Sequence, residues 1–460
     1  MKQYTIRGFD DLLVNSTQFR KLKTREKKLL LFDRCNWYIS SIRNQNIKED
    51  KSYGTFVNLK SKILKKYLGD RNYKDIQKCL VGLGIIIENN KYSTNKFSKS
   101  FSLTKKAIKL GFEKRNIYSK KFKIKIKQLS EISYADINSN PTLKKILDNT
   151  TKILVVEEPS HYVLDIIPEP KYVETDNGLL DISEQVKQFT FDRYNAYYNS
   201  FFALNKITDS KVLFNSPIFY IPSIVSSGRI YHTIASMPKL IRESLRTKSN
   251  ELIWEVDMCS AQPSIIFLEW LKNVKNNDNS NIKDEFKLCF KLLLGGNIYE
   301  YIQDNSTFFK GLNYNNLKVS VLTTFNAEDK PTEPNKELSR LFPNLMRWVN
   351  LIKKESGYKE ISSIGQKAEA NIFVEVYKKI PNDKFALIIH DCILIIKEDV
   401  VLVKELLEKR IRELYKEIIL PEHNLDKLFK IDLVSIPDEK LQKNRREAYY
   451  KEYLEDQIIN

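Results

Sequence analysis

Two aspartates end strongly apolar segments of this 460-residue chain, and their positions fit a metal-dependent phosphoryl-transfer site. Asp391 lies between the apolar runs Phe385–Ile389 and Ile393–Ile396, and Asp257 ends the segment Leu252–Asp257. A buried carboxylate is costly unless a cation pairs with it, and a divalent metal ion is the usual partner. Two such carboxylates, brought together from distant parts of the sequence, predict a two-metal site for phosphoryl transfer.

The elements expected to position these aspartates are short strands. The apolar runs on either side of His390 and Asp391 are too short for helices and predict a buried β-hairpin with this pair at its tip. Between the two aspartates, residues 317–327 have the spacing of a helix and carry Lys318, a candidate cation for a phosphate group. Arg229, upstream of both aspartates, is a second candidate cation.

Positive charge is concentrated in the N-terminal third of the chain. The net charge is +18, and residues 1–150 contain 34 Lys and Arg against 13 Asp and Glu, a balance of +21 that leaves −3 for the remainder. A compositional bias toward lysine explains the number of lysines but not this asymmetry. The N-terminal third is therefore expected to bind a polyanion, and nucleic acid is the favoured one.

The composition narrows the class of protein further. An apolar content of 42% over 460 residues predicts two or three domains with ordinary cores. The sequence contains no apolar stretch of membrane-spanning length and no secretory signal, so no membrane partner is expected. Its five cysteines are scattered without a CxxC motif, which favours a reduced, cytoplasmic location and argues against zinc.

Residues 51–104 predict a winged helix-turn-helix. Residues 59–68 and 72–83 have helical spacing and each segment ends at a glycine, and a strand at 85–88 leads through a basic connection to an apolar segment at 101–104. In this fold the second helix enters the major groove of DNA and the wing contacts phosphates. One alternative is a small α+β domain with no special function. Another is a winged helix that binds a protein instead of DNA. The candidate DNA-binding residues on the second helix and the wing are Lys74, Lys78, Lys96 and Lys99.

Two segments follow the expected winged helix. The alternation of lysine with apolar residues from Lys121 to Lys127 predicts a strand with one basic face. Residues 157–180 contain Pro, Glu and an Asp-Asn-Gly sequence, and they predict a linker.

The order of these motifs resembles that of family A DNA polymerases and of the related single-subunit RNA polymerases of phages and mitochondria. Asp257 resembles the motif A aspartate, Lys318 the lysine of the motif B fingers helix, and His390-Asp391 the motif C pair. Arg229, in Gly-Arg-Ile-Tyr, and Gln366, in Gly-Gln-Lys-Ala-Glu-Ala, also resemble family positions. The resemblance covers about residues 185–435, and its elements together are more specific than any one of them.

The resemblance implies an α+β, right-hand polymerase fold with palm, fingers and thumb. It divides the chain into a basic winged-helix-like nucleic-acid-binding domain at 1–150, a linker at 151–180 and a polymerase domain at 181–460. It implies that Asp257, Asp391 and the carbonyl of Met258 hold two Mg²⁺ (or Mn²⁺) ions. Lys318 would then bind the triphosphate, and Gln262 would select the sugar of the nucleotide. His390 and Gln366 would hold the primer end, and Arg229 the template or hybrid.

The chain also departs from the family pattern. Tyr314 occupies the position of an expected arginine, and Cys392 follows the motif C aspartate where family A has a glutamate, which the related RNA polymerases lack. The residues after Asp257 resemble the motif A of family B more closely. Gln262 is bulky, as in enzymes that exclude the ribose 2′ hydroxyl, and this favours deoxynucleotides.

These observations predict a template-directed DNA polymerase, suited to a phage or mobile element, that uses dNTPs on a primed DNA template. One alternative is a single-subunit RNA polymerase or primase that uses NTPs on the same palm. Another is a DNA-binding replication initiator or regulator whose palm is inactive.

Overall fold

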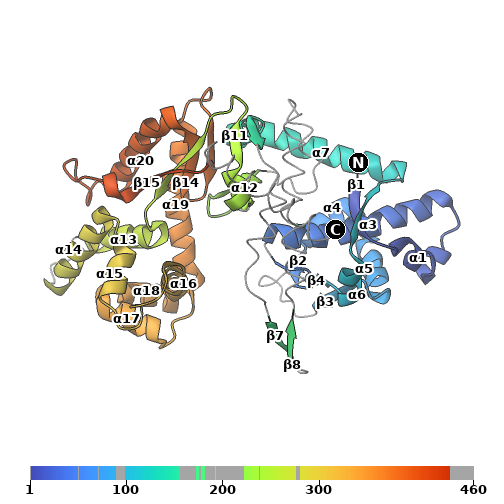
Figure 1. Cartoon of the computed structure of the whole chain (residues 1–460), viewed down its shortest axis with the longest axis horizontal. Helices are drawn as coiled ribbons and strands as arrows, with labels where there is room; N and C mark the ends of the chain where they lie inside the picture. Colours follow the sequence, from blue (N-terminus) through green and yellow to red (C-terminus); the bar gives the residue numbers. More distant parts are fainter. Residues whose placement is uncertain are drawn as a thin grey trace, which may run out of the picture. The chain divides into compact units, whose positions relative to one another are not determined.

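The computed structural model contains two compact units, and both combine helices with small sheets (Figure 1). The chain is therefore a mixed α and β protein. The first unit is Met1–Pro141 with Val155–Ile221 and Ser236–Ile241, and the second is Thr142–Leu154, Pro222–Ala235 and Arg242–Asn460. The residues that the structure describes are 2–49, 51–70, 72–89, 99–155, 172–175, 178–181, 192, 222–237, 239–275 and 280–435.

A four-stranded antiparallel sheet forms the centre of the second unit. In spatial order its strands are β13 (Ala386–Ile389), β14 (Cys392–Ile396), β12 (Ile253–Met258) and β15 (Phe429–Leu433). β13 and β14 are the predicted hairpin, with His390 and Asp391 as its turn. Almost every residue of the hairpin strands is buried, because helices cover the sheet.

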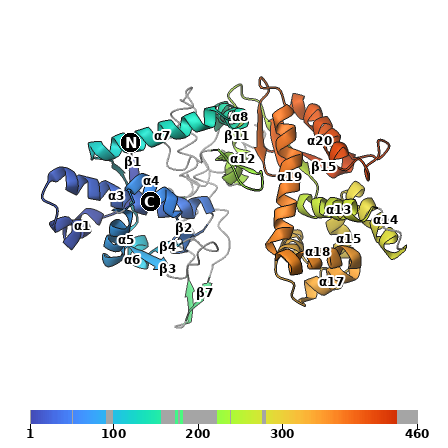
Figure 2. The same cartoon turned by 180° about the vertical axis from the view of Figure 1, so that it is seen from behind.

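Two helices, α19 (Lys359–Lys379) and α20 (Val400–Leu414), pack against this sheet and against each other (Figure 2). Other helices of the unit also pack against α19, among them α13 (Ala261–Val274), α16 (Tyr314–Asn326) and α18 (Pro343–Ser356). Between α13 and α18 the chain also forms α14 (Ser280–Gly295), α15 (Ile298–Asp304) and α17 (Glu333–Leu341).

The predicted lysine-bearing helix is confirmed as α16. It begins one residue after Asn313, whose side chain accepts a hydrogen bond from the backbone N–H of Asn316 at 2.9 Å, an N-cap that satisfies one of the free donors of the first turn. At its other end the buried Lys353 of α18 donates a hydrogen bond to the carbonyl of Thr324 at 2.7 Å. Both ends of the helix are thus fixed.

Short elements complete the second unit. β9 (Ser223–Ile224) pairs with β10 (Ile230–Tyr231), and β6 (Ile153–Val155) pairs with β11 (Leu245–Thr247). The others are α8 (Pro141–Thr150) and the 3₁₀ turns Lys397–Asp399 and Asp426–Leu428. The 3₁₀ turn Ile234–Ser236 and α12 (Lys239–Glu243) each include residues of both units, because Ser236–Ile241 belongs to the first.

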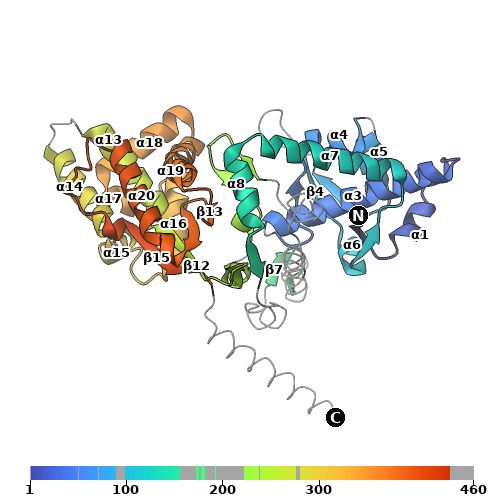
Figure 3. The same cartoon turned by 90° about the horizontal axis from the view of Figure 1, so that it is seen from above.

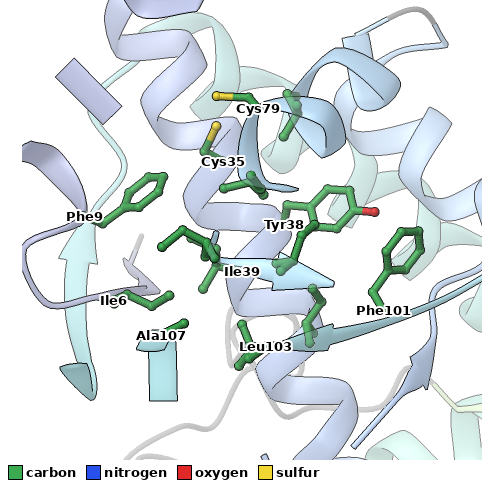
Figure 4. Packing of buried hydrophobic residues seen from close by; sticks show 14 of the residues in the cluster. Ile6, Phe9, Cys35, Tyr38, Ile39, Cys79, Phe101, Leu103 and Ala107 are labelled. Atoms are coloured by element: carbon green, nitrogen blue, oxygen red, sulfur yellow. The ribbon is translucent and has the colours of Figure 1, made fainter. Parts of the chain in front are cut away.

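The first unit is built around the long helix α3 (Arg25–Glu49), which supplies Cys35, Tyr38 and Ile39 to its core (Figure 4). The Tyr38 ring meets the edge of Phe101 at a centroid distance of 5.6 Å. β1 (Lys2–Ile6) pairs with β5 (Phe112–Asn116). The other elements described up to residue 116 are α1 (Phe9–Val14), α2 (Thr17–Arg20), β2 (Val57–Asn58), α4 (Ser61–Leu68), α5 (Asn72–Gly82), β3 (Ile86–Asn89), β4 (Ser100–Leu103) and α6 (Lys105–Leu110).

The secondary structure predicted for residues 59–104 is confirmed. Helices α4 and α5 occupy the two helical segments, and Gly69 follows α4 with a backbone φ of 95°, a conformation that glycine adopts without strain. β3 and β4 form the hairpin, and β2 joins it to give a three-stranded sheet in the order β2-β4-β3. Lys96, placed on the wing, lies outside the described residues.

The strand predicted for Lys121–Lys127 is wrong, because these residues begin helix α7 (Lys120–Asn138). Ser119 caps this helix, since its hydroxyl accepts a hydrogen bond from the backbone N–H of Phe122. The alternation covers only seven residues, and the four lysines in it are themselves good helix formers, so the local sequence is equally compatible with the capped helix. Phe122 faces the core and Ile124 faces solvent, which a strand does not allow.

Two boundaries differ from those expected. Residues 142–154 belong to the second unit, because Lys145 of α8 is buried there and donates hydrogen bonds to the carbonyls of Tyr377 and Ile380. Part of the predicted linker is a hairpin, β7 (Tyr172–Thr175) with β8 (Gly178–Asp181), and residues 156–171 lie outside the described part of the chain. Among the described helices, none is long and apolar enough to cross a membrane.

The packing of α7 predicts unequal effects for two neighbouring apolar residues. Phe122 is 1% exposed, so Phe122→Ala should lower the free energy of unfolding by about 3–5 kcal/mol. Ile124 is 57% exposed, so Ile124→Ala should change it by less than about 0.5 kcal/mol. Urea unfolding of the full chain, followed by circular dichroism, measures both. Equal losses would contradict the helical assignment, since residues two apart share a face only in a strand.

Candidate active site

The sheet of the second unit brings the two predicted catalytic aspartates together. β12 pairs with β14 in a register that sets Asp257 opposite Cys392, the residue directly after Asp391. The backbone N–H of Met258 donates a hydrogen bond to the carbonyl oxygen of Asp391 at 3.3 Å. Strand pairing thus joins two residues that lie 134 positions apart in the sequence.

The negative charge of the Asp257 carboxylate is poorly compensated by its surroundings. Burial, together with the negative charges of Asp391 and Glu255, raises the pKa of Asp257 to about 7. Its Oδ1 atom is buried and has no hydrogen-bond partner among the described residues. A bare carboxylate oxygen beside a second carboxylate is a suitable ligand for a hard divalent cation.

The donor set suits magnesium better than zinc. Within the described ranges, no group of three or more His, Cys, Asp or Glu side chains is positioned to hold a metal ion. Mg²⁺ is commonly held by one or two carboxylates together with water and substrate phosphates, whereas zinc takes three or four protein ligands. Met258, whose carbonyl the family resemblance implies as a further ligand, is buried next to Asp257.

The turn that carries Asp391 is conformationally strained. His390 has a backbone φ of 50°, which is unfavourable for a residue with a side chain, and such strain is often retained at functional sites. Its ring meets the Tyr231 ring edge-on at a centroid distance of 5.1 Å, and its buried Nδ1 has no hydrogen-bond partner among the described residues. Burial and the nearby Arg229 lower the pKa of His390, which favours the neutral imidazole.

Arg229 is held by a buried ion pair with Glu369 of α19. The Nη2 group of Arg229 contacts Glu369 Oε2, and the two side chains are 12% and 2% exposed. Burial raises the pKa of Glu369 to about 7, while Arg229 acts in the opposite direction. Arg229 Nε and Glu369 Oε1 are buried without hydrogen-bond partners among the described residues, so the hydrogen-bonding capacity of the pair is incompletely satisfied.

The segment before β10 lies directly on α19. A Cβ atom added to Gly228 would lie 3.1 Å from the Cβ of Ala370, so glycine permits this close approach. Gln366, Glu369 and Ala370 share one face of α19, because they are three and four positions apart. Gln366 itself donates a hydrogen bond to the hydroxyl of Ser362 at 3.1 Å.

Helix α16 directs its first turns toward the aspartates. Lys318 is exposed, and its positive charge lowers the pKa of Asp257. Asp257 in turn contributes to raising the pKa of Tyr314, which lies one helical turn before Lys318. Tyr314, the residue in the position of the expected arginine, packs edge-on against Tyr299 at 5.7 Å.

Gln262 lies in the first turn of α13, which follows β12 after a sharp bend. The bend includes Ser260, with a φ of 49°. Gln262 is partly buried, five positions after Asp257, and so lies at the same end of β12 as the aspartates.

The candidate DNA-binding lysines of the first unit have different surroundings. Lys74 and Lys78 are exposed on α5, as predicted for an outward helix face. Lys99 forms an ion pair with Glu88 across the β3–β4 hairpin, so it is partly neutralised.

Sequence reasoning missed three residues of this site. Glu369 and Tyr231 lie within the motifs that contain Gln366 and Arg229, but the sequence assigned neither of them a role of its own. Glu255 lies two residues before Asp257, so the two side chains share one face of β12, and its carboxylate lies 3.9 Å from the Cys392 sulfur. Period-two spacing along the strand is the signal that would have found it.

Comparisons with known proteins do not identify a family. No protein-family model matches the sequence, and no curated protein shows significant similarity to it.

The aspartate pair predicts a stability that responds to pH and to magnesium. A carboxyl group with a raised pKa favours folding below its unfolded-state pKa of about 4, and this contribution is lost as the pH rises through about 7. At pH 8 without metal, Asp257→Asn should therefore be more stable than the wild type. Magnesium should stabilise the wild type and leave the variant unchanged, as measured by urea unfolding with and without EDTA.

Asp399→Asn is the matched control for this experiment. Asp399 is also a buried carboxylate of the second unit, but it pairs with Lys384 at 2.9 Å. This variant should lose stability and keep the response to magnesium. A wild-type protein with no response to millimolar magnesium would count against the metal site.

The Arg229–Glu369 pair predicts a strong energetic coupling. Glu369→Ala leaves a guanidinium nearly buried without its counter-charge, which should cost about 3–5 kcal/mol. The double variant Arg229→Met/Glu369→Leu should cost less than the sum of the two single changes. A double-mutant cycle by urea unfolding measures the coupling, and simple additivity would show that the pair is not a unit.

Proposed function

We propose that this chain is a template-directed DNA polymerase that uses two divalent metal ions for nucleotidyl transfer. The observation that carries the proposal is the antiparallel pairing of β12 with the β13–β14 hairpin, which sets Asp257 beside Asp391. This arrangement, with a lysine-bearing helix close to the aspartates, is what the resemblance to family A polymerases implies. In these terms the sheet corresponds to the palm and α16 to the fingers helix.

The residues suit the chemistry of nucleotidyl transfer. Asp257 and Asp391 would hold two Mg²⁺ ions, which when bound supply activation of the primer 3′ hydroxyl and stabilisation of the pyrophosphate. Lys318 would neutralise negative charge on the incoming triphosphate. The protein contributes position and electrostatics, because phosphoryl transfer needs little covalent participation from side chains.

The Arg229 segment and α19 would contact the primer–template. Glu369 holds Arg229, which leaves fewer side-chain rotamers to be ordered when nucleic acid binds. The lowered pKa of His390 favours a neutral imidazole, and its Nδ1 has no hydrogen-bond partner among the described residues, so the ring would donate or accept a hydrogen bond at the primer end. Gln366 would contribute from the same face of α19 as Glu369.

The first unit would deliver the polymerase to DNA. Its helices α4 and α5 and its three-stranded sheet follow the element order of a winged helix. Lys74 and Lys78 on the exposed face of α5 would contact the duplex, and Lys99 would do so only after separating from Glu88.

A single-subunit RNA polymerase or primase is the second candidate, and Cys392 favours it. Cys392 is buried and burial raises its thiol pKa, so it brings no negative charge to the position where family A DNA polymerases have a glutamate. Gln262 favours the opposite choice because it is bulky. The two candidates differ in substrate, and not in the metal site.

Primer extension tests the proposal and its alternatives. The wild type should extend a primed DNA template with dNTPs and magnesium, and Asp391→Ala should reduce incorporation by at least about a thousandfold while DNA binding persists. Gln262→Gly should increase the use of NTPs relative to dNTPs. Extension by NTPs alone would select the RNA polymerase.

An exposed acidic residue away from the aspartates provides the control. Asp284→Ala, on the exposed surface of α14, should leave extension unchanged. If Asp391→Ala keeps full activity, or if the wild type binds DNA but incorporates no nucleotide, the initiator or regulator alternative replaces the polymerase.

A further inference from the structure

The first half of α7 carries a strong positive charge that the winged helix does not use. Five lysines occur within eight residues, and four of them are exposed. The lysines are Lys120, Lys121, Lys123, Lys125 and Lys127. Lys127 lies 4.0 Å from Glu131, which is the limiting distance for an ion pair.

The partly buried Arg34 of α3 extends this charge toward the protein interior. Its Nε atom is buried and has no hydrogen-bond partner among the described residues. Lys125 is close enough to Arg34 and Lys121 that both positive charges, after burial itself, lower the pKa of Lys125. Three cations therefore lie together at the contact of α3 with α7.

The acidic groups around these cations are already engaged in hydrogen bonds. Asp33, next to Arg34, accepts backbone hydrogen bonds from Tyr118 at 3.0 Å and Ser119 at 2.6 Å, and Glu26 accepts the Ser119 hydroxyl at 2.7 Å. Within the described part of the chain, no carboxylate lies within 4.0 Å of the charged nitrogens of Arg34, Lys121 or Lys125. Like charges held together without an anion favour binding of one.

This cluster lies beside the helix-turn-helix. Helix α4 packs against both α5 and α7, and Figure 3 shows α4 and α7 next to each other. α4 adds Lys62 and Lys66, both exposed. A basic surface thus runs from α7 across α4, the helix that crosses the DNA backbone in helix-turn-helix proteins.

We propose that Arg34, Lys121 and Lys125 form a binding site for the phosphates of a DNA duplex, beside the duplex contacts of α5. This inference rests on the proposed DNA-binding function of the first unit and adds to it a site on α3 and α7. The guanidinium of Arg34 binds a phosphate through its N–H groups, and the two lysines act as point charges on neighbouring phosphates.

An anionic membrane surface fits these residues less well. A membrane-bound amphipathic helix needs a continuous exposed apolar face beside its lysines. On α7, Phe122 is buried in the core, and Ile124 is the exposed large apolar residue between the lysines. One exposed isoleucine gives too little apolar surface for membrane insertion.

The salt dependence of DNA binding tests the site. The full chain is titrated with a fluorescent 20-base-pair duplex between 0.05 and 0.5 M KCl, and the slope of log affinity against log salt is measured. Each lost phosphate contact reduces the slope by about 0.9, so Lys121→Ala/Lys125→Ala should reduce it by about 2 and weaken binding by about tenfold per lysine at 0.1 M salt. Lys121→Arg/Lys125→Arg should keep the wild-type slope.

Lys105→Ala/Lys109→Ala is the matched control, because it removes the same charge from exposed positions of α6. It should change the slope by less than half as much. Equal effects of the two double variants would show a general charge effect and overturn the site, as would an unchanged slope in Lys121→Ala/Lys125→Ala.

Two further measurements separate this site from other interpretations. The first is binding to phosphatidylserine–phosphatidylcholine vesicles. If Lys121→Ala/Lys125→Ala (the α7 variant) weakens vesicle binding and leaves duplex binding unchanged, the ligand of this site is a membrane surface and not DNA. Primer extension at saturating duplex should be the same in the α7 variant and the wild type. If the α7 variant has a smaller salt slope for duplex binding but the wild type extends no primer, the phosphate site is supported and the polymerase function is overturned.

Discussion

The pairing of β12 with β14 is the interaction on which the candidate site depends. Its register decides that Asp257 faces Cys392, and thereby that two carboxylates meet at the end of the sheet. A slip of one residue would turn Asp257 to the opposite face, which packs against apolar side chains. The alternation along β12 specifies this register, because Val256 and Met258 are buried on one face while Glu255 and Asp257 lie on the other.

Around this pairing the protein concentrates features that cost stability. Asp257 has a raised pKa, His390 has a left-handed backbone, and Glu369 is nearly buried and also has a raised pKa. Each of these residues, and Arg229, has a buried polar atom without a hydrogen-bond partner in the described part of the chain. Elsewhere in the second unit the sheet and helices pack through apolar contacts, and this packing offsets the cost. Such a distribution is typical of a site prepared for a charged ligand.

Sequence patterns were most informative where local and tertiary preferences agree. The hairpin, the α4–α5 pair and α16 were predictable from the sequence. In each segment the apolar spacing agrees with the glycines or polar residues at its ends about which element forms. The prediction of a strand from Lys121 to Lys127 was wrong, because the short alternation of lysine with apolar residues lies within the 19-residue helix α7. The ion pair of Arg229 with Glu369 was not predictable, because residues 140 positions apart produce no local sequence pattern.

The sequence by itself determined which residues are available for chemistry: two aspartates at the ends of apolar strands, one lysine on a helix between them, and a basic N-terminal third. These follow from residue type and local periodicity. Only the tertiary structure decided which of them meet. Strand register joined Asp257 to Asp391, and the close packing of Gly228 on Ala370 accompanies the pairing of Arg229 with Glu369. Contacts between distant segments depend on the shape of the whole core, which no single stretch of sequence encodes.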